Sequence, residues 1–309
     1  MSRPIVHIGY HKTATTWFQK SFYPRVRNFA YVDRARVKRA FLLDTPFAFD
    51  PARARAALGL DAAKPPILCE EGLSGYLHNG GLGGYLSAEV ARRIKAVLPD
   101  ARIVVFVRAQ PSMVAATYQQ YVRGGGTRSV KRYLFPERYL RGAAAERHKI
   151  PRFSFDHFEY DRLVAHYDAI FGREDVLVVP YEEFRRRPDA TVAWMAERLG
   201  MDVELGGKAR EAVNRSYGAP LIPLARAMNL FTARTVLDKS VLVDIPGWYG
   251  ARRFILERLN ATGLFGDPPP PERLLGRDVV GHIRERYAES NRRLLALRDL
   301  PLGELGYPL

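Results

Sequence analysis

Residues 5–20 constrain the fold more than any other stretch of this 309-residue chain. The segment begins with an apolar run at 5–8, passes through a short turn with one glycine and one lysine, and continues into 17–19, which can be helical. A turn between a strand and a helix presents backbone N–H groups that favour an anion such as phosphate. Lys12 adds a positive charge, and Gly9 lets the chain leave the strand. The alternative interpretation is a buried strand followed by a threonine-rich helix cap.

The turn does not have the spacing of the P-loop that binds nucleoside triphosphates. In that motif, GxxxxGK[ST], the lysine lies six positions after the first glycine. Lys12 lies three positions after Gly9, and no second glycine precedes it. No residue of this turn is clearly placed to bind Mg²⁺ as the P-loop serine or threonine does. We therefore expect no metal.

Composition indicates a folded protein with a large core. Apolar residues make up 47% of the chain and aromatic residues 11%. We expect one domain over 1–309, with its core at about 1–200 and a helical elaboration at about 203–309. The single cysteine, Cys69, rules out an intramolecular disulfide and favours a reducing compartment. With no signal peptide and no apolar run of roughly 20 residues, the prediction is a soluble, cytoplasmic protein.

The net charge of +15 is compatible with nucleic acid, an anionic membrane surface or a polyanionic small ligand. The arginines are scattered rather than gathered in one block, and no recognisable nucleic-acid-binding motif is present. We therefore expect much of this charge to lie on a solvated surface, and it would still attract a nucleotide with several phosphate charges.

Strand-like and helix-like segments alternate along the chain, which predicts a mostly parallel sheet flanked by helices. Residues 127–158 are basic and aromatic without a clear period, and we expect them to cap one edge of the sheet. The predicted strands are 5–8, 28–32, 67–69, 101–107 and 176–180, and the main predicted helices are 34–43, 87–98, 111–122, 160–171, 188–199 and about 278–297.

Charged residues follow two of these strands directly. Glu70 and Glu71 follow 67–69, and Arg108 follows 101–107. Because ligands bind beyond the carboxyl ends of parallel strands, these side chains are candidates for a site shared with Lys12. The guanidinium of Arg108 suits a second phosphate. Taken alone, the two glutamates are also compatible with an acidic pair at a helix start, and Arg108 with a surface ion pair.

The segment HKTATTW, residues 11–17, resembles the 5′-phosphosulfate loop of sulfotransferases, whose commonest form is PKSGTTW. Lys12, Thr15, Thr16 and Trp17 match, and Thr13 and Ala14 are small-residue replacements. The resemblance is to bacterial enzymes of the carbohydrate or small-molecule type. It implies a three-layer, P-loop-like α/β fold with a helical and loop cap, and the donor 3′-phosphoadenosine 5′-phosphosulfate (PAPS). The donor-binding residues it implies in this segment are His11, Lys12, Thr13, Ala14, Thr15, Thr16 and Trp17.

In sulfotransferases a strand-end arginine and a serine eight residues later hold the 3′-phosphate. Arg108 fits the arginine, but the eighth residue after it is Ala116. Thr117 or Ser112 is the candidate replacement for the missing hydroxyl. Two later segments, 213–216 (VNRS, with Arg215) and 287–294 (YAESNRRL), also resemble blocks of the bacterial enzymes.

The resemblance implies in-line transfer of a sulfuryl group to a hydroxyl or an amine of a glycan, a lipid or another small molecule. ILCEEGLS, residues 67–74, resembles the segment in which a glutamate acts as base, so Glu71 is the first candidate and Glu70 the second. His11 and His78 are alternative bases, and Lys12 is expected to stabilise the leaving phosphate oxygen. The rival functions are a nucleotide or small-molecule kinase and a basic nucleic-acid-binding protein. The acceptor and the oligomeric state are left open.

Overall fold

Five parallel strands form one sheet, in the order β2-β3-β1-β4-β5. A computed structural model describes residues 3–60, 63–142, 146, 148–204, 216–234, 236 and 238–309. The strands are β1 Ile5–Gly9, β2 Ala30–Val32, β3 Pro66–Cys69, β4 Arg102–Val107 and β5 Val176–Pro180. β1 lies in the middle of the sheet, between β3 and β4. The turns that follow these three strands therefore meet at one edge, as the sequence predicted.

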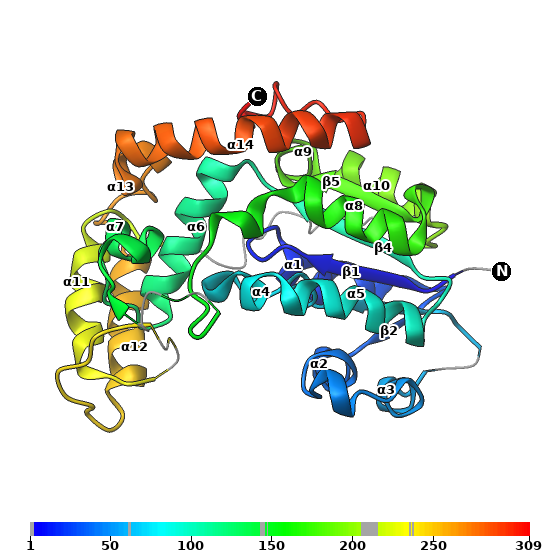
Figure 1. Ribbon diagram of the computed structural model, residues 1–309, viewed down its shortest axis with the longest axis horizontal. Coiled ribbons are helices and arrows are strands. Elements are labelled where there is room, and N and C mark those ends of the chain that lie inside the picture. Colours follow the sequence, from blue (N-terminus) through cyan, green and yellow to red (C-terminus); the bar gives the residue numbers. More distant parts are fainter. Residues whose placement is uncertain are drawn as a thin grey trace.

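Helices cover both faces of the sheet (Figure 1). The helices are α1 Thr15–Trp17, α2 Arg34–Phe41, α3 Pro51–Leu58, α4 Gly80–Gly83, α5 Tyr85–Val97, α6 Gln110–Arg123, α7 Val130–Leu134, α8 Tyr160–Phe171, α9 Tyr181–Arg186, α10 Pro188–Leu199, α11 Leu221–Met228, α12 Trp248–Ala261, α13 Pro271–Leu275 and α14 Arg277–Leu297. Because both faces are covered, β1 and β3 are buried at every position.

Alternate residues of each strand enter two separate hydrophobic clusters. In β4, Ile103 and Val105 belong to the larger cluster, which α2, α5, α6, α8 and α14 complete. Val104 and Phe106 point to the opposite face, where Phe18 from the first helical segment and residues of α10 cover them. This alternation divides the protein into three layers and confirms the predicted fold class.

Most element boundaries follow the sequence prediction closely. The helix at 160–171, the strand at 176–180 and the helix at 188–199 occur at the predicted positions. The glycine-rich stretch 72–84, expected to be a loop, instead forms short helical turns and α4. Within 127–158, Tyr133 and Phe153 are buried in the larger cluster, so part of the expected cap belongs to the core.

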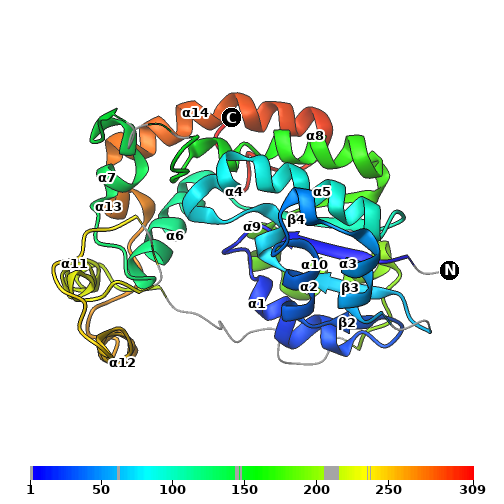
Figure 2. The same ribbon diagram turned by 60° about the horizontal axis from the view of Figure 1, so that its bottom comes forward.

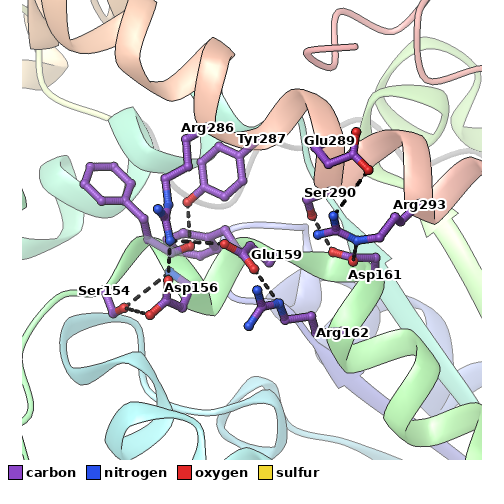
Figure 3. Close-up of polar contacts among 12 residues, drawn as sticks. Ser154, Asp156, Glu159, Asp161, Arg162, Arg286, Tyr287, Glu289, Ser290 and Arg293 are labelled. Atoms are coloured by element: carbon purple, nitrogen blue, oxygen red, sulfur yellow. Dashed lines mark hydrogen bonds and ion pairs between the residues drawn. The ribbon is translucent and has the colours of Figure 1, made fainter.

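The C-terminal helix α14 is fixed to the start of α8 by a polar network (Figure 3). Arg286 pairs with Asp156 and Glu159, and Arg293 donates to Asp161 over 2.6 Å. On the neighbouring face Asn291 bonds Gln110 of α6. The segment 287–294, singled out in the sequence, thus ties α14 to the sheet layers. The division into a core of 1–200 and a C-terminal elaboration stays a prediction.

Helices α11 and α12 form an arm at the end of the molecule opposite the N-terminus (Figures 1 and 2). The chain enters the arm after 216 and leaves it through the prolines at 268–271, which lead into α13 and α14. Among the helices that the structure describes, none combines the length and the apolar character that crossing a bilayer requires.

Candidate active site

The turn after β1 adopts left-handed backbone conformations at three positions. Gly9, Lys12 and Ala14 have φ of 93°, 63° and 66°. A Cβ atom at Gly9 would lie 3.1 Å from the backbone of Glu71 and 3.2 Å from its Cβ, so only glycine lets the two segments approach this closely. Left-handed backbone at non-glycine residues is uncommon, and such strained residues cluster at active sites and ligand-binding turns.

Lys12 is held in a crowded, positively charged place. Its Nζ lies 3.4 Å from Oε1 of Gln120 in α6. Burial, reinforced by Arg123 and Arg108, lowers the pKa of Lys12 to about 8. The ammonium group is therefore charged at neutral pH but poorly stabilised by the protein, and an anionic ligand would relieve both effects.

Arg108 extends from the end of β4 and bonds the turn after β1 directly. Its Nη1 donates to the carbonyl oxygen of Lys12 over 2.9 Å, and its Nε donates to Oγ of Ser112 over 2.8 Å. The guanidinium carbon lies 4.9 Å from the centre of the Tyr181 ring. These contacts fix the direction of the side chain, and neither of the two hydrogen bonds uses Nη2.

Glu70 and Glu71 leave the end of β3 in different directions. Glu70 is buried, forms an ion pair with Arg34 over 2.7 Å and accepts a hydrogen bond from the N–H of Gly72 over 3.0 Å. Glu71 lines the cleft described below, and Arg34 and Gln19 donate to its two carboxylate oxygens over 2.8 and 2.9 Å. The geometry therefore favours Glu71 over Glu70 as a group that can meet a substrate.

The carboxylate of Glu71 is ionised at neutral pH. Burial acts to raise its pKa, but His11, Arg34 and the hydrogen bond from Gln19 outweigh burial and keep the pKa below its ordinary value. Glu71 can therefore accept a proton, although the same partners make it a weaker base than a solvated carboxylate.

The two candidate histidines are placed differently. His11 lines the cleft, and burial lowers its pKa to about 4, so its imidazole is neutral at neutral pH. Its Nδ1 is buried without a hydrogen-bond partner among the described residues. His78 does not line the cleft, and its Nδ1 lies 2.6 Å from the hydroxyl of Tyr133. Of the alternative bases, only His11 is positioned to meet a ligand there.

The remaining predicted residues separate into two groups. Thr13 is buried and donates to the carbonyl of Tyr10, and Thr117 is buried and donates to the carbonyl of Met113 over 2.9 Å. Neither lines the cleft, so the structure favours Ser112 as the hydroxyl beside Arg108. Arg215 lies outside the described residues, as do 213 and 214. The predicted residues that line the cleft are His11, Lys12, Ala14, Thr15, Thr16, Trp17, Glu71, Arg108 and Ser112.

These side chains share one cleft of about 1520 Å³. The sequence interpretation missed one wall, the face of α6 that carries Gln119, Gln120 and Arg123 in register with Ser112. The helical period counted from Ser112 would have revealed it. The other missed lining residues come from α9 and from the arm, and they include Tyr181, Phe184, Arg185, Arg186, Tyr217, Tyr249, Arg253 and Glu257.

Lys12, Arg108 and Glu71 line the same cleft, and together they carry more positive than negative charge. Within the described residues, no three His, Cys, Asp or Glu side chains are grouped so that they could hold a metal ion. The arrangement thus combines a turn with left-handed backbone, an arginine fixed by hydrogen bonds and a carboxylate in one cleft.

A protein-family model matches part of the chain. A model of the sulfotransferase family matches residues 86–204, which include β4, Arg108 and α6 but not the turn after β1. The match covers less than half of the 309 residues, and it shows that this segment is similar to the sulfotransferase family. No curated protein matches the chain.

Two solved structures are similar to this chain at low sequence identity. A sulfotransferase from Alicyclobacillus acidocaldarius is 18% identical with a TM-score of 0.48, over 80% of this chain and 99% of that one. Mouse sulfotransferase SULT7A1, complexed with PAP, is 14% identical with a TM-score of 0.45, over 99% of this chain and 90% of that one. The likeness to the sulfotransferase family is carried by the matched segment 86–204, not by these two structures.

Proposed function

We propose that the protein transfers the sulfuryl group of PAPS to a hydroxyl or an amine of a glycan, a lipid or another small molecule. The observation that carries the proposal is the hydrogen bond between Arg108 and the carbonyl of Lys12. This bond joins two cationic residues, which follow β1 and β4, in one cleft. A ligand with phosphates at two positions could bind both residues there.

The turn after β1 is the proposed site of the 5′-phosphosulfate. Lys12, with its low pKa and buried ammonium group, gains most from a bound anion. Thr15 and Thr16 line the cleft beside it and can donate their hydroxyl hydrogens. The likeness of HKTATTW to the sulfotransferase loop supports the same assignment, because the two residue sets coincide.

Arg108 and Ser112 are the proposed site of the 3′-phosphate. Ser112 accepts from Nε of Arg108 and donates to the carbonyl of Ala109 over 3.0 Å, so its hydroxyl orients the guanidinium. Ala116 lines the cleft on the same face of α6 and leaves space where related enzymes carry a hydroxyl.

Glu71 is the proposed base. It takes the proton of the acceptor hydroxyl or amine while the acceptor atom forms a bond to sulfur and the bond from sulfur to the 5′-phosphate oxygen breaks. Lys12 stabilises the negative charge that develops on this phosphate oxygen. The products are the sulfated acceptor and 3′-phosphoadenosine 5′-phosphate. Because His11 is neutral and lines the same cleft, it is the alternative base.

A reducing, cytoplasmic location is proposed on the single cysteine, Cys69, which is buried and unpaired. No metal is included in the proposed reaction, because the turn lacks the spacing that positions Mg²⁺ in nucleoside-triphosphate-binding P-loops.

Calorimetry with 3′-phosphoadenosine 5′-phosphate tests the donor site. Lys12→Ala and Arg108→Ala should each weaken binding at least tenfold, because each removes a charge-assisted contact worth roughly 1.5–3 kcal/mol. Lys20→Ala, at an exposed position outside the cleft, is the matched control and should bind as the wild type does. Unchanged affinity in both site variants would refute the assignment, and Mg²⁺-dependent turnover of ATP would point to a kinase instead.

A further inference from the structure

The arm carries an ordered, exposed apolar segment. Val241, Leu242, Val243 and Ile245 are 41%, 72%, 53% and 44% exposed, and we call these four side chains the apolar tip. Isolated exposed apolar side chains are ordinary on soluble proteins, but four within five consecutive residues form a contiguous patch of the kind that marks an interaction surface.

Backbone hydrogen bonds hold the tip against the rest of the arm. The N–H of Leu242 donates to Leu230 over 2.8 Å, and the N–H of Ile245 donates to Phe231 over 3.1 Å. At the start of α12, Nε1 of Trp248 donates to the carbonyl of Met228 over 2.8 Å. The backbone is thus fixed while the apolar side chains face outward, so the exposure is a feature of the folded arm.

Two basic residues precede the tip closely in the chain. Arg234 is exposed, and Nζ of Lys239 donates to the carbonyl of Arg234 over 2.6 Å, so both cations lie together just before the tip. Asp238 binds Arg128 over 2.9 Å, and Asp244 accepts from the N–H of Ala233 over 2.8 Å. An apolar patch with cations beside it fits an anionic lipid surface, where the chains insert and the phosphates attract lysine and arginine.

A second copy of this chain fits the same surface less well. It would bring the same cations to the interface, on a protein whose net charge is already +15. Like charges in contact oppose association. Charge complementarity therefore selects the lipid surface as the partner.

We propose that the apolar tip docks the protein on a bilayer that contains anionic phospholipids. On α12, Tyr249, Arg253 and Glu257, spaced by four residues, line the cleft, while Phe254 is 61% exposed. One helix thus belongs to both the docking arm and the cleft wall. If the proposed function holds, an acceptor embedded in the bilayer would be presented at the cleft.

Cosedimentation of the full chain with vesicles tests the docking, without donor or acceptor. Binding is expected to vesicles of phosphatidylcholine with phosphatidylglycerol, to weaken with added salt, and to fall at least fivefold on phosphatidylcholine alone. The double variant Leu242→Ser/Val243→Ser should bind roughly tenfold less, and Arg234→Glu should lose binding only to anionic vesicles. Phe47→Ser is the matched control, since Phe47 is fully exposed in the segment between α2 and α3.

Binding of 3′-phosphoadenosine 5′-phosphate by the double variant serves as the folding check, and it should equal that of the wild type. The proposal is overturned if anionic vesicles bind none of the protein, or if Phe47→Ser lowers binding as much as the double variant does. It is also overturned if the tip variants instead abolish a dimer seen by light scattering without vesicles. Because no sulfate transfer is measured, failure here is distinct from failure of the proposed function.

Discussion

Nη1 of Arg108 lies 2.9 Å from the carbonyl oxygen of Lys12, so the end of β4 holds the turn that follows β1. The two residues come from adjacent strands and are 96 positions apart in the chain. The arginine therefore has two roles in the proposed site. Its guanidinium binds the donor, and its hydrogen bond stabilises the left-handed backbone that orients the side chain of Lys12. Loss of either residue should disturb the position of the other.

Glu71→Gln should slow sulfate transfer roughly 10²–10⁴-fold while leaving donor affinity unchanged, because the amide cannot take the acceptor proton. Labelled-sulfate transfer and calorimetry measure the two effects separately. Since Glu71 has a lowered pKa, wild-type activity should persist until the pH falls below the ordinary range of a glutamate.

Glu70→Gln is the matched comparison for the adjacent carboxylate. It weakens the buried pair with Arg34, so its main effect should be a lower melting temperature, with transfer reduced far less than in Glu71→Gln. A larger loss of transfer in Glu70→Gln, at equal folding, would exchange the roles of the two residues. If transfer survives both changes, His11→Ala becomes the decisive variant.

Donor affinity should fall as the pH rises through the pKa of Lys12, about 8. Below that pH the ammonium group is already protonated, so binding takes up little proton there. Above it the bound phosphates favour the protonated form, and binding must take up a proton. Calorimetry at pH of about 8.5 in buffers of different ionisation enthalpy measures this uptake.

The control for this pH effect is Lys12→Ala, which should bind more weakly and lose most of the proton uptake. Uptake that is undiminished in Lys12→Ala would assign the titration to another group. An affinity that is constant across this pH range would contradict the lowered pKa itself.

Gly9→Ala should lower both stability and transfer, whereas Gly84→Ala should lower stability only slightly. The two glycines have nearly the same backbone angle, φ of 93° and 92°. A Cβ atom at Gly84 meets nothing within 4 Å, but at Gly9 it would press on the backbone of Glu71 at 3.1 Å. Both variants carry the cost of a left-handed alanine, of order 1 kcal/mol. Thermal melts and transfer rates should therefore differ, and equal behaviour would show that the approach of Glu71 is unimportant.

Ala116→Ser should tighten binding of 3′-phosphoadenosine 5′-phosphate by roughly 2- to 10-fold, since it returns a hydroxyl to the family position. Ala115→Ser, which also lines the cleft, is the positional control and should have a smaller effect. Thr117→Val should leave affinity unchanged, because the hydroxyl of Thr117 is bonded to Met113. Weaker binding in Ala116→Ser would place the 3′-phosphate elsewhere in the cleft.

Local patterns were enough to predict the strands and most of the helices. β5 and α8 carry their signals within their own residues, as apolar runs and helical spacing, and both begin and end where predicted. The order of Lys12, Glu71 and Arg108 at strand ends also predicted a shared edge, since parallel strands bring their carboxyl ends together.

Tertiary contacts were outside the reach of such patterns. Nothing in the pair Glu70-Glu71 reveals that Arg34 binds both carboxylates while Gln19 reaches only Glu71. The helical segment after the turn also continues as a π-helix at Phe18–Phe22, and no pattern in the sequence predicts this distortion. The contribution of the arm to the cleft depends on how a distant part of the chain folds back.

The bond network of α14 bears on the order of folding. Gln110 and Asn291 are 181 positions apart and exchange two hydrogen bonds inside the protein, and Asn291 also donates to the carbonyl of Pro308. In a nascent chain, Gln110 therefore cannot form its bonds with Asn291 until α14 has been synthesised. Closing so long a loop late makes the final docking of α14 a slow step. Until that step, α6 lacks its contact with α14. Because α6 carries one wall of the cleft, catalytic competence should arise only at the end of folding.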